Sequence, residues 1–156
     1  MFDKRRSQSG FSLAEMLIVI AMIGVTVGIA IPLVNEQLRI AEVRSAADQM
    51  AVHLRAARMI AVSHHKDIVV TVNAENASVL PNTLSYEGTN GDTQTIQMPG
   101  LVKIKTGSTA SITFHSDGSS DASSTVTTES VVSNATERWV LTVNILGLVS
   151  VAHTRV

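Results

Sequence analysis

A single carboxylate, Glu15, stands at the start of a long apolar segment. From Met16 to Val34 the only polar side chain is that of Thr26, and no residue is charged. Insertion scales put the cost of a carboxylate inside a membrane at about 2.5–3.5 kcal/mol, so such a residue indicates a function and a cationic partner. We therefore looked for a cationic group that could pair with Glu15.

The nearest basic residues, Lys4, Arg5 and Arg6, all precede Gly10. If the chain were cut after Gly10, the new α-amine of Phe11 would lie four residues before Glu15. An amine and a carboxylate at nearly the same depth could pair between neighbouring molecules. A buried polar pair of this kind sets the register of adjacent helices.

The element that carries Glu15 is predicted to be a membrane-spanning helix. The segment from Phe11 to Val34 has 24 residues, and a helix of that length covers roughly 36 Å against about 30 Å of hydrocarbon. Basic residues precede it, so the N-terminus is expected in the cytoplasm. A secretory signal peptide has a shorter apolar core and a small-residue cleavage site. An uncleaved signal anchor is the better alternative, but it leaves Glu15 unexplained.

The order of basic leader, Gly10, Phe11, Glu15 and apolar span resembles the class III signal of type IV pilins and type II secretion pseudopilins. The resemblance covers about the first 35 residues. It implies that prepilin peptidase cleaves after Gly10 and methylates the amine of Phe11, and that Glu15 is the assembly residue. Residues 1–10 would then be a cleaved leader, and residues 11–34 the transmembrane half of the N-terminal helix.

Three helix-weakening residues follow at a spacing of four: Gly24, Gly28 and Pro32. Glycine costs a helix interior about 1 kcal/mol and proline about 3 kcal/mol. Two interpretations stay open for the glycines, namely the ordinary composition of membrane helices and local unwinding when the subunit leaves the bilayer. The position of Pro32 resembles the kinking proline of the pilin family, which favours a kink at that residue.

Residues 35–62 change to an amphipathic pattern and are predicted to continue the helix, which would run from about Ser12 to Val62. One apolar face is formed by Val43, Ala47, Met50, Leu54 and Ala57. We expect Met50 and Met59 to pack in the core.

Residues 63–156 are predicted to form a periplasmic β domain, rich in threonine, serine and valine. Two loops are expected, at Asn82–Asp92 and Asp117–Ser124, and a hairpin turn at Gly147. Trp139 is expected in the core. The strands are predicted at Ile68–Val72, Ser78–Leu80, Thr95–Met98, Val102–Lys105, Ser111–Phe114, Thr125–Val132, Trp139–Ile145 and Val149–His153. The fold class is α+β, a long N-terminal helix packed on an antiparallel β-sheet domain, as in the pilin fold.

The segment Phe114–Gly118 and the glycine turn at Gly147 are similar to the type II secretion pseudopilin H and FimT/FimU-type minor pilin family. In that family the turn often continues with arginine, whereas Leu148 follows here. This departure and a net charge of -1 argue against nucleic-acid binding, which needs clustered cations.

Other chemistry finds little support. The chain has no cysteine, which excludes disulfides and thiol catalysis. Adjacent His64 and His65 do not make a metal shell, and the loop Asp117–Asp121 lacks the ligands of a calcium loop of the EF-hand type. No catalytic or phosphate-binding motif is present. We expect no enzyme activity, no metal and no cofactor.

These patterns together predict a minor pseudopilin held in the bacterial inner membrane and then built into a periplasmic pseudopilus near its tip, supporting protein export. The alternative is a minor pilin of a type IV pilus, acting in assembly priming, adhesion or DNA uptake. The resemblance implies three kinds of partner: prepilin peptidase, other pseudopilins or pilins, and the inner-membrane assembly platform.

Overall fold

A computed structural model describes residues 11–130 and 137–155 of the chain. The chain divides into two compact units, residues 1–37 and residues 38–156, called here the first and second units. Gly10 and the predicted leader lie outside the described residues. So do the last two residues of the strand predicted at Thr125–Val132.

Helix α1 spans Leu13–His64, 52 residues, close to the range predicted from the sequence. It ends because His65 adopts a left-handed backbone with φ of 51°. The Lys66 amide then donates to the Ala61 carbonyl at 3.1 Å. This arrangement closes the last turn as in a Schellman motif.

In the first unit, α1 exposes apolar side chains on all sides. A window of 18 residues within it has a mean hydropathy of 2.7 and none of its residues is buried. By length and composition, α1 is the one helix among the described residues that could cross a membrane. A helix that is apolar all round needs lipid or other protein around it.

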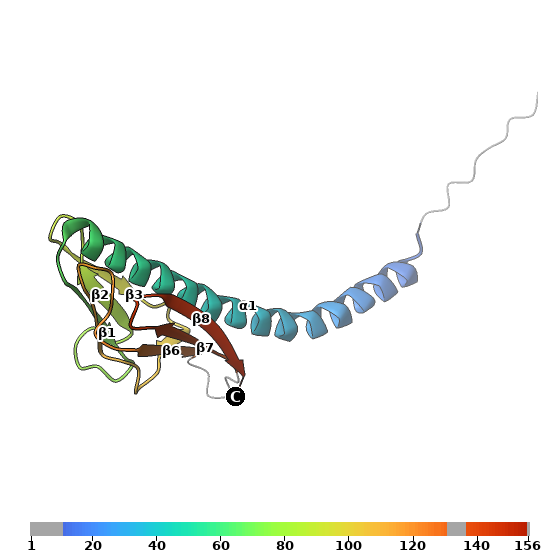
Figure 1. Ribbon diagram of the computed structural model, residues 1–156. Helices are drawn as coiled ribbons and strands as arrows, with labels where there is room; N and C mark the ends of the chain where they lie inside the picture. The colour runs from blue at the N-terminus through green and yellow to red at the C-terminus, as the bar shows by residue number, and fades with distance from the viewer. Residues whose placement is uncertain (1–10, 131–136, 156) are drawn as a thin grey trace, which may run out of the picture. The chain divides into compact units, whose positions relative to one another are not determined.

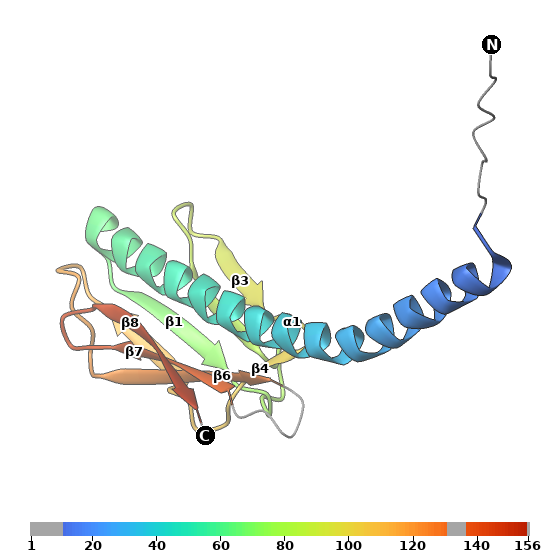
Figure 2. The same cartoon turned by 90° about the vertical axis from the view of Figure 1, so that its right-hand side faces the viewer.

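The second unit holds two antiparallel four-stranded sheets against α1 (Figures 1 and 2). Sheet one has the order β3-β2-β1-β5, and sheet two has the order β4-β6-β7-β8. The strands are β1 (Ile68–Asn73), β2 (Thr83–Glu87), β3 (Thr93–Gln97), β4 (Val102–Ile104), β5 (Ser111–Phe114), β6 (Ser124–Ser130), β7 (Glu137–Val143) and β8 (Val149–Arg155).

The core lies between α1 and both sheets. The predicted apolar face of the helix is confirmed, because Val43, Ala47, Met50, Leu54 and Ala57 are all at most 2% exposed. Their partners from sheet one include Val70, Leu84 and Ile112, and those from sheet two include Val126 and Leu141. Small alanines on α1 let the helix approach the sheets closely. The predicted α+β fold is thereby confirmed.

Two of the predicted local structures are wrong. The predicted loop Asn82–Asp92 contains strand β2, in which Leu84 and Tyr86 are buried while Ser85 and Glu87 alternate with them. The predicted strand Ser78–Leu80 is instead a run of bends. Its two apolar side chains point to solvent, because Leu80 has a left-handed φ of 48° that breaks an extended conformation.

The structure also corrects one core prediction and refines another. Met59 is 72% exposed, because it lies on the face of α1 opposite to Met50. Trp139 is half-buried and packs against the edge of the core. The predicted turn at Gly147 is confirmed between β7 and β8, with a φ of 71° at the glycine.

Candidate assembly site

Glu15 lies in the first turn of α1. An acidic side chain is favoured there, because the helix N-terminus carries partial positive charge. Ser12 directly precedes the helix, and the Ser12-x-x-Glu15 spacing is that of a capping box, which favours a helix start at this point. This signal is visible in the sequence but was not part of the predicted site.

The surroundings of Glu15 are apolar and open to solvent. Phe11 is 76% exposed, Leu13 78% and Met16 52%. Among the described residues, no side chain pairs with the Glu15 carboxylate. The structure therefore places Phe11 and Glu15 at the same end of an uncovered apolar helix, and leaves the carboxylate available to another molecule.

The helix-weakening residues lie within α1, which continues through Gly24, Gly28 and Pro32. A Cβ added at either glycine would meet no other atom within 4 Å. Between them, the Thr26 hydroxyl donates to the Met22 carbonyl at 2.8 Å, which satisfies the only polar side chain between Met16 and Val34. The glycines leave open backbone that a neighbouring helix could approach closely.

In the second unit, Arg58 ties α1 to two distant turns. Its Nε donates to the Gly118 carbonyl at 2.8 Å and its Nη2 donates to the Leu146 carbonyl at 3.1 Å. The turns meet at their glycines, because a Cβ on Gly147 would lie only 2.1 Å from the Gly118 oxygen. We call Arg58, Gly118 and Gly147 the arginine clamp. Charge-assisted bonds of this kind are stronger than neutral ones.

His115 joins two further segments. Its Nδ1 lies 3.0 Å from Asp67 Oδ2, just after α1, and its Nε2 lies 2.6 Å from Asp121 Oδ1. Hydrogen bonds to these carboxylates, Asp67 first, raise the pKa of His115. The imidazolium form, which can donate through both nitrogens, is thus stabilised.

A cluster of four charged side chains lies at sheet two, three of them on its strands. Lys103 Nζ is 3.2 Å from Glu75 and 3.5 Å from Glu129, and Arg138 Nε donates to Glu129 at 2.8 Å. The hydrogen bond with Glu75 is the main cause that raises the pKa of Lys103. Glu129 is only 9% exposed, and its two cationic neighbours compensate its burial.

Several other polar side chains of the described residues lie in turns or on the surface. The described residues contain no group of three or more His, Asp or Glu side chains placed to hold a metal ion. The Asp117 carboxylate accepts from the Ser119 amide and hydroxyl, at 2.8 and 2.6 Å. Those bonds lower the pKa of Asp117 and are ordinary turn chemistry. His64 and His65 are both exposed.

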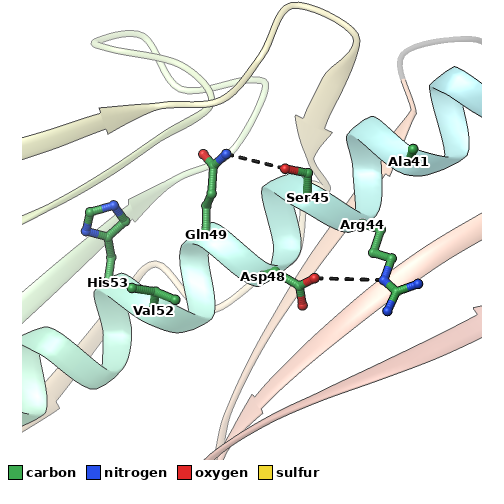
Figure 3. Close-up of a pocket in the computed structure, with 7 residues that line it drawn as sticks. All are labelled: Ala41, Arg44, Ser45, Asp48, Gln49, Val52 and His53. Atoms are coloured by element: carbon green, nitrogen blue, oxygen red, sulfur yellow. Dashed lines mark hydrogen bonds and ion pairs between the residues drawn. The ribbon is translucent and has the colours of Figure 1, made fainter.

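Two shallow grooves border α1. One of ≈ 410 Å³ is lined by α1 alone, with an Arg44–Asp48 ion pair of 3.9 Å and a Gln49–Ser45 hydrogen bond of 3.4 Å on its surface (Figure 3). The other, of ≈ 460 Å³, lies between the end of α1 and the β2–β3 hairpin.

Comparisons with known proteins agree with this picture. The prokaryotic N-terminal methylation motif matches residues 5–31, and the type II transport protein GspH family matches residues 46–147. The minor pseudopilin EpsH from the type 2 secretion system of Vibrio cholerae is similar in structure, with a TM-score of 0.55 and 14% identity over 71% of this chain and 96% of that chain. The type IV minor pilin FimU of Pseudomonas aeruginosa gives a TM-score of 0.53 and 19% identity over 72% of this chain and 89% of that one. A comparison with curated proteins finds no match.

The resemblance read from the sequence, to pilin-like minor pseudopilins, is therefore confirmed at the level of family and fold. At 14% and 19% identity, the similarity to the two solved structures supports the fold alone.

Proposed function

Because the chain belongs to the type II transport protein GspH family, we propose that it is a minor subunit of a type II secretion pseudopilus. In this proposal prepilin peptidase processes the chain, which then assembles near the filament tip and supports protein export. The observation that carries the proposal is the presence, in one chain, of the methylation motif at residues 5–31 and the family domain at residues 46–147. The family is one of structural subunits, so no catalysis is assigned to the chain.

Maturation is proposed to occur at Gly10 and Phe11. Cleavage after Gly10 removes residues 1–10 and frees the amine of Phe11, which is then methylated. A small residue before the cut leaves room for the peptidase, so a bulky replacement of Gly10 should block processing. Phe11 lies outside helix α1, in an exposed position that suits an enzyme at the membrane surface.

Localisation follows from the same segment. Before assembly, residues 11–34 would span the bacterial inner membrane once, with the N-terminus in the cytoplasm and residues 63–156 in the periplasm. Residues 35–62 would extend the helix outside the lipid. The assembly platform in the inner membrane and other pseudopilins are the partners that this arrangement requires.

Assembly is proposed to depend on Glu15. Its carboxylate has no partner among the described residues and sits on an apolar surface, where burial costs about 2.5–3.5 kcal/mol. Pairing with the Phe11 amine of a neighbouring subunit would offset much of that cost and fix the axial offset between helices. Gly24, Gly28 and Pro32 would let α1 unwind locally as the subunit leaves the bilayer.

The test compares Glu15→Ala with Glu36→Ala, a matched change at another exposed acid of α1. We expect Glu15→Ala to insert and be processed normally, but to enter sheared filaments about tenfold less, because the Phe11 amine of the neighbouring subunit loses its partner. A tenfold loss corresponds to about 1.4 kcal/mol of pairing free energy. Glu36→Ala should assemble normally. Mass spectrometry of the wild type should show methylated Phe11 as the first residue. Equal incorporation of the two variants would refute the role of Glu15.

A minor pilin of a type IV pilus is the second candidate. The methylation motif at residues 5–31 is compatible with either machine, since it concerns maturation of the N-terminus and not the destination of the subunit. Deletion of the gene separates the two functions. Loss of protein export with intact surface pili supports the secretion role, and loss of surface pili with intact export supports the pilus role.

A further inference from the structure

Strand β3 is an outer strand of sheet one, and β2 is its one partner among the described strands. The Gly88 amide donates to the Asp92 carbonyl at 2.7 Å, and the Met98 amide donates to the Asn82 carbonyl at 2.9 Å. Because successive residues of an antiparallel strand bond to opposite sides, the even-numbered residues of β3 bond to β2. The odd-numbered residues therefore direct their amides and carbonyls away from the sheet. They are Thr93, Thr95 and Gln97.

On two of the other outer strands, the backbone groups that face away from the sheet have partners. On β4, the Ile104 carbonyl accepts from the Glu75 amide at 3.0 Å, and the Ile104 amide donates to Asn82 Oδ1 at 2.9 Å. On β5, the Thr113 carbonyl accepts from the Asp121 amide at 3.3 Å. These contacts leave little room for a further strand on either edge.

The outer strand β8 carries charge at its edge. Arg55 of α1 donates to the Val149 carbonyl at 3.2 Å, and Arg155 ends the strand. Charge, proline and bulges are the devices that keep a further strand from pairing with an edge. The five residues of β3, Thr-Gln-Thr-Ile-Gln, include no charged residue and no proline, and their register with β2 has no bulge. Among the described strands, β3 therefore has the regular and uncharged edge.

A groove borders β3 on the side of α1. It is the groove of ≈ 460 Å³ described above, and its lining includes Gln94 of β3, Tyr86 of β2 and Met59 of α1. Alternate side chains of a strand lie on one face. A strand added to β3 would thus direct every second side chain to the face on which Gln94 lines the groove. We expect apolar residues at those positions, because Met59 is 72% exposed beside them.

We propose that β3 accepts an extended strand from a different pseudopilin, which adds a fifth strand to sheet one. A row of outward amides and carbonyls at strand spacing is complementary to an extended polypeptide. Main-chain hydrogen bonds would supply the affinity, and the groove would select the alternate side chains. The proposal rests on the proposed function, because assembly with other pseudopilins supplies the neighbouring strand.

A second copy of this chain does not fit the edge of β3. Two β3 strands that pair antiparallel are related by a two-fold axis perpendicular to the sheet. Because α1 packs on the face of sheet one (Figure 2), this axis would make the two α1 helices run in opposite directions. Subunits inserted in one membrane with one topology cannot be arranged so. A parallel pair sets outward residues opposite inward ones, so two identical edges would be shifted by one residue and the copies would not be equivalent.

Photocrosslinking in cells that assemble the filament tests the contact. A photoreactive benzoylphenylalanine replaces Thr93, an exposed residue of β3, in the full chain. The products are probed with antibodies against this chain and against each other pseudopilin of the cell. We expect a cross-link to one other pseudopilin. Adding Thr95→Pro should lower its yield about tenfold, because proline removes an outward amide. Thr95→Ala keeps that amide and should leave the yield unchanged.

Thermal unfolding in detergent controls for the fold of the variants. Proline is tolerated in an edge strand where its nitrogen faces solvent. Thr95→Pro should therefore melt within about 4 °C of the wild type, whereas Gln94→Pro removes an amide bonded to β2 and should melt much lower. Thr95→Lys is a second variant that keeps every amide. A charge on an edge blocks strand addition, so this variant should show the same loss of cross-link.

The outcomes separate the strand contact from the proposed function. A cross-link that persists at full yield in Thr95→Pro and Thr95→Lys overturns the contact, and so does a cross-link only to a second copy or to an exported protein. Absence of a cross-link while the chain is present in the filament fraction overturns the contact and leaves the proposed function standing. A cross-link that depends on Thr95, with the chain absent from the filament fraction, refutes the filament role and retains the contact. Absence of both overturns both.

Discussion

Replacing Gly147 with alanine is expected to destabilise the second unit far more than replacing Gly107 with alanine. Both glycines have a left-handed φ, of 71° and 93° respectively. A Cβ on Gly107 would meet nothing within 4 Å, whereas a Cβ on Gly147 would lie 2.1 Å from the Gly118 oxygen and 2.8 Å from Arg58 Nε. The pair therefore separates the cost of backbone conformation from the cost of the collision.

The expected magnitudes follow from these distances. A left-handed alanine costs about 1 kcal/mol, and this cost is common to both variants. At Gly147 the turns must also move apart by nearly 1 Å to bring the contact to the 3.0 Å below which real Cβ contacts essentially never fall. Overpacking of this kind costs about 1–3 kcal/mol. Loss of an Arg58 hydrogen bond adds about 1 kcal/mol. We expect a total of about 4 kcal/mol for Gly147→Ala and about 1 kcal/mol for Gly107→Ala.

Thermal unfolding of the full chain in detergent measures the difference, followed by near-ultraviolet circular dichroism. At about 4 °C per kcal/mol for a domain of this size, the melting temperature should fall by about 15 °C for Gly147→Ala and about 4 °C for Gly107→Ala. Equal decreases would refute the reasoning, because they would mean that the two turns separate at no cost. The variant Arg58→Ala should also destabilise, since it removes the donor that joins them.

Three further predictions concern stability and use the same assay. Hydrogen bonds to two aspartates raise the pKa of His115. Its contribution to the free energy of unfolding should therefore be complete below the unfolded-state pKa of about 6.5 and be lost as pH rises through the higher folded-state pKa. His115→Gln should remove this pH dependence of the melting temperature, and a variant with the same pH profile as the wild type would contradict the prediction. Glu129→Ala should cost about 1–3 kcal/mol, because it removes the carboxylate that Arg138 bonds and one of the two carboxylates beside Lys103, and a change in melting temperature within error would argue against this charged cluster. Met50→Ala should lower the free energy of unfolding by about 2–5 kcal/mol and Met59→Ala by less than about 0.5 kcal/mol, because only Met50 is buried. Similar decreases in melting temperature for the two variants would contradict the assigned faces of α1.

The division of the chain into a long helix and a β domain could be predicted, because it depends on composition and on the helical spacing of apolar residues. The steps between Val43, Ala47, Met50, Leu54 and Ala57 place all five on one helical face, and the structure buries all of them. The apolar span and the methylation motif are continuous sequence signals, so the family could be predicted as well.

The local errors have a physical origin in short segments. Strand β2 has only two apolar side chains, Leu84 and Tyr86, between turn residues, and pairing with β1 and β3 decides its conformation. Met59 belongs to no apolar face, although its residue type suggested the core. The arginine clamp could not be predicted, because Arg58 binds backbone carbonyls 60 and 88 positions away. Every residue has a backbone carbonyl, so the sequence does not indicate which carbonyls accept from Arg58.

The order in which the chain visits the two sheets governs how the domain can be made. Strands β1 to β3 enter sheet one, β4 enters sheet two, β5 returns to sheet one, and β6 to β8 complete sheet two. Neither sheet is built from a contiguous stretch, so the sequence separation of contacting residues is large and folding is slow. Sheet one is incomplete until β5 is available, and sheet two is incomplete until β8 is available as its edge strand. A chain that stops before β8 therefore leaves β7 at the edge of sheet two with one unpaired side.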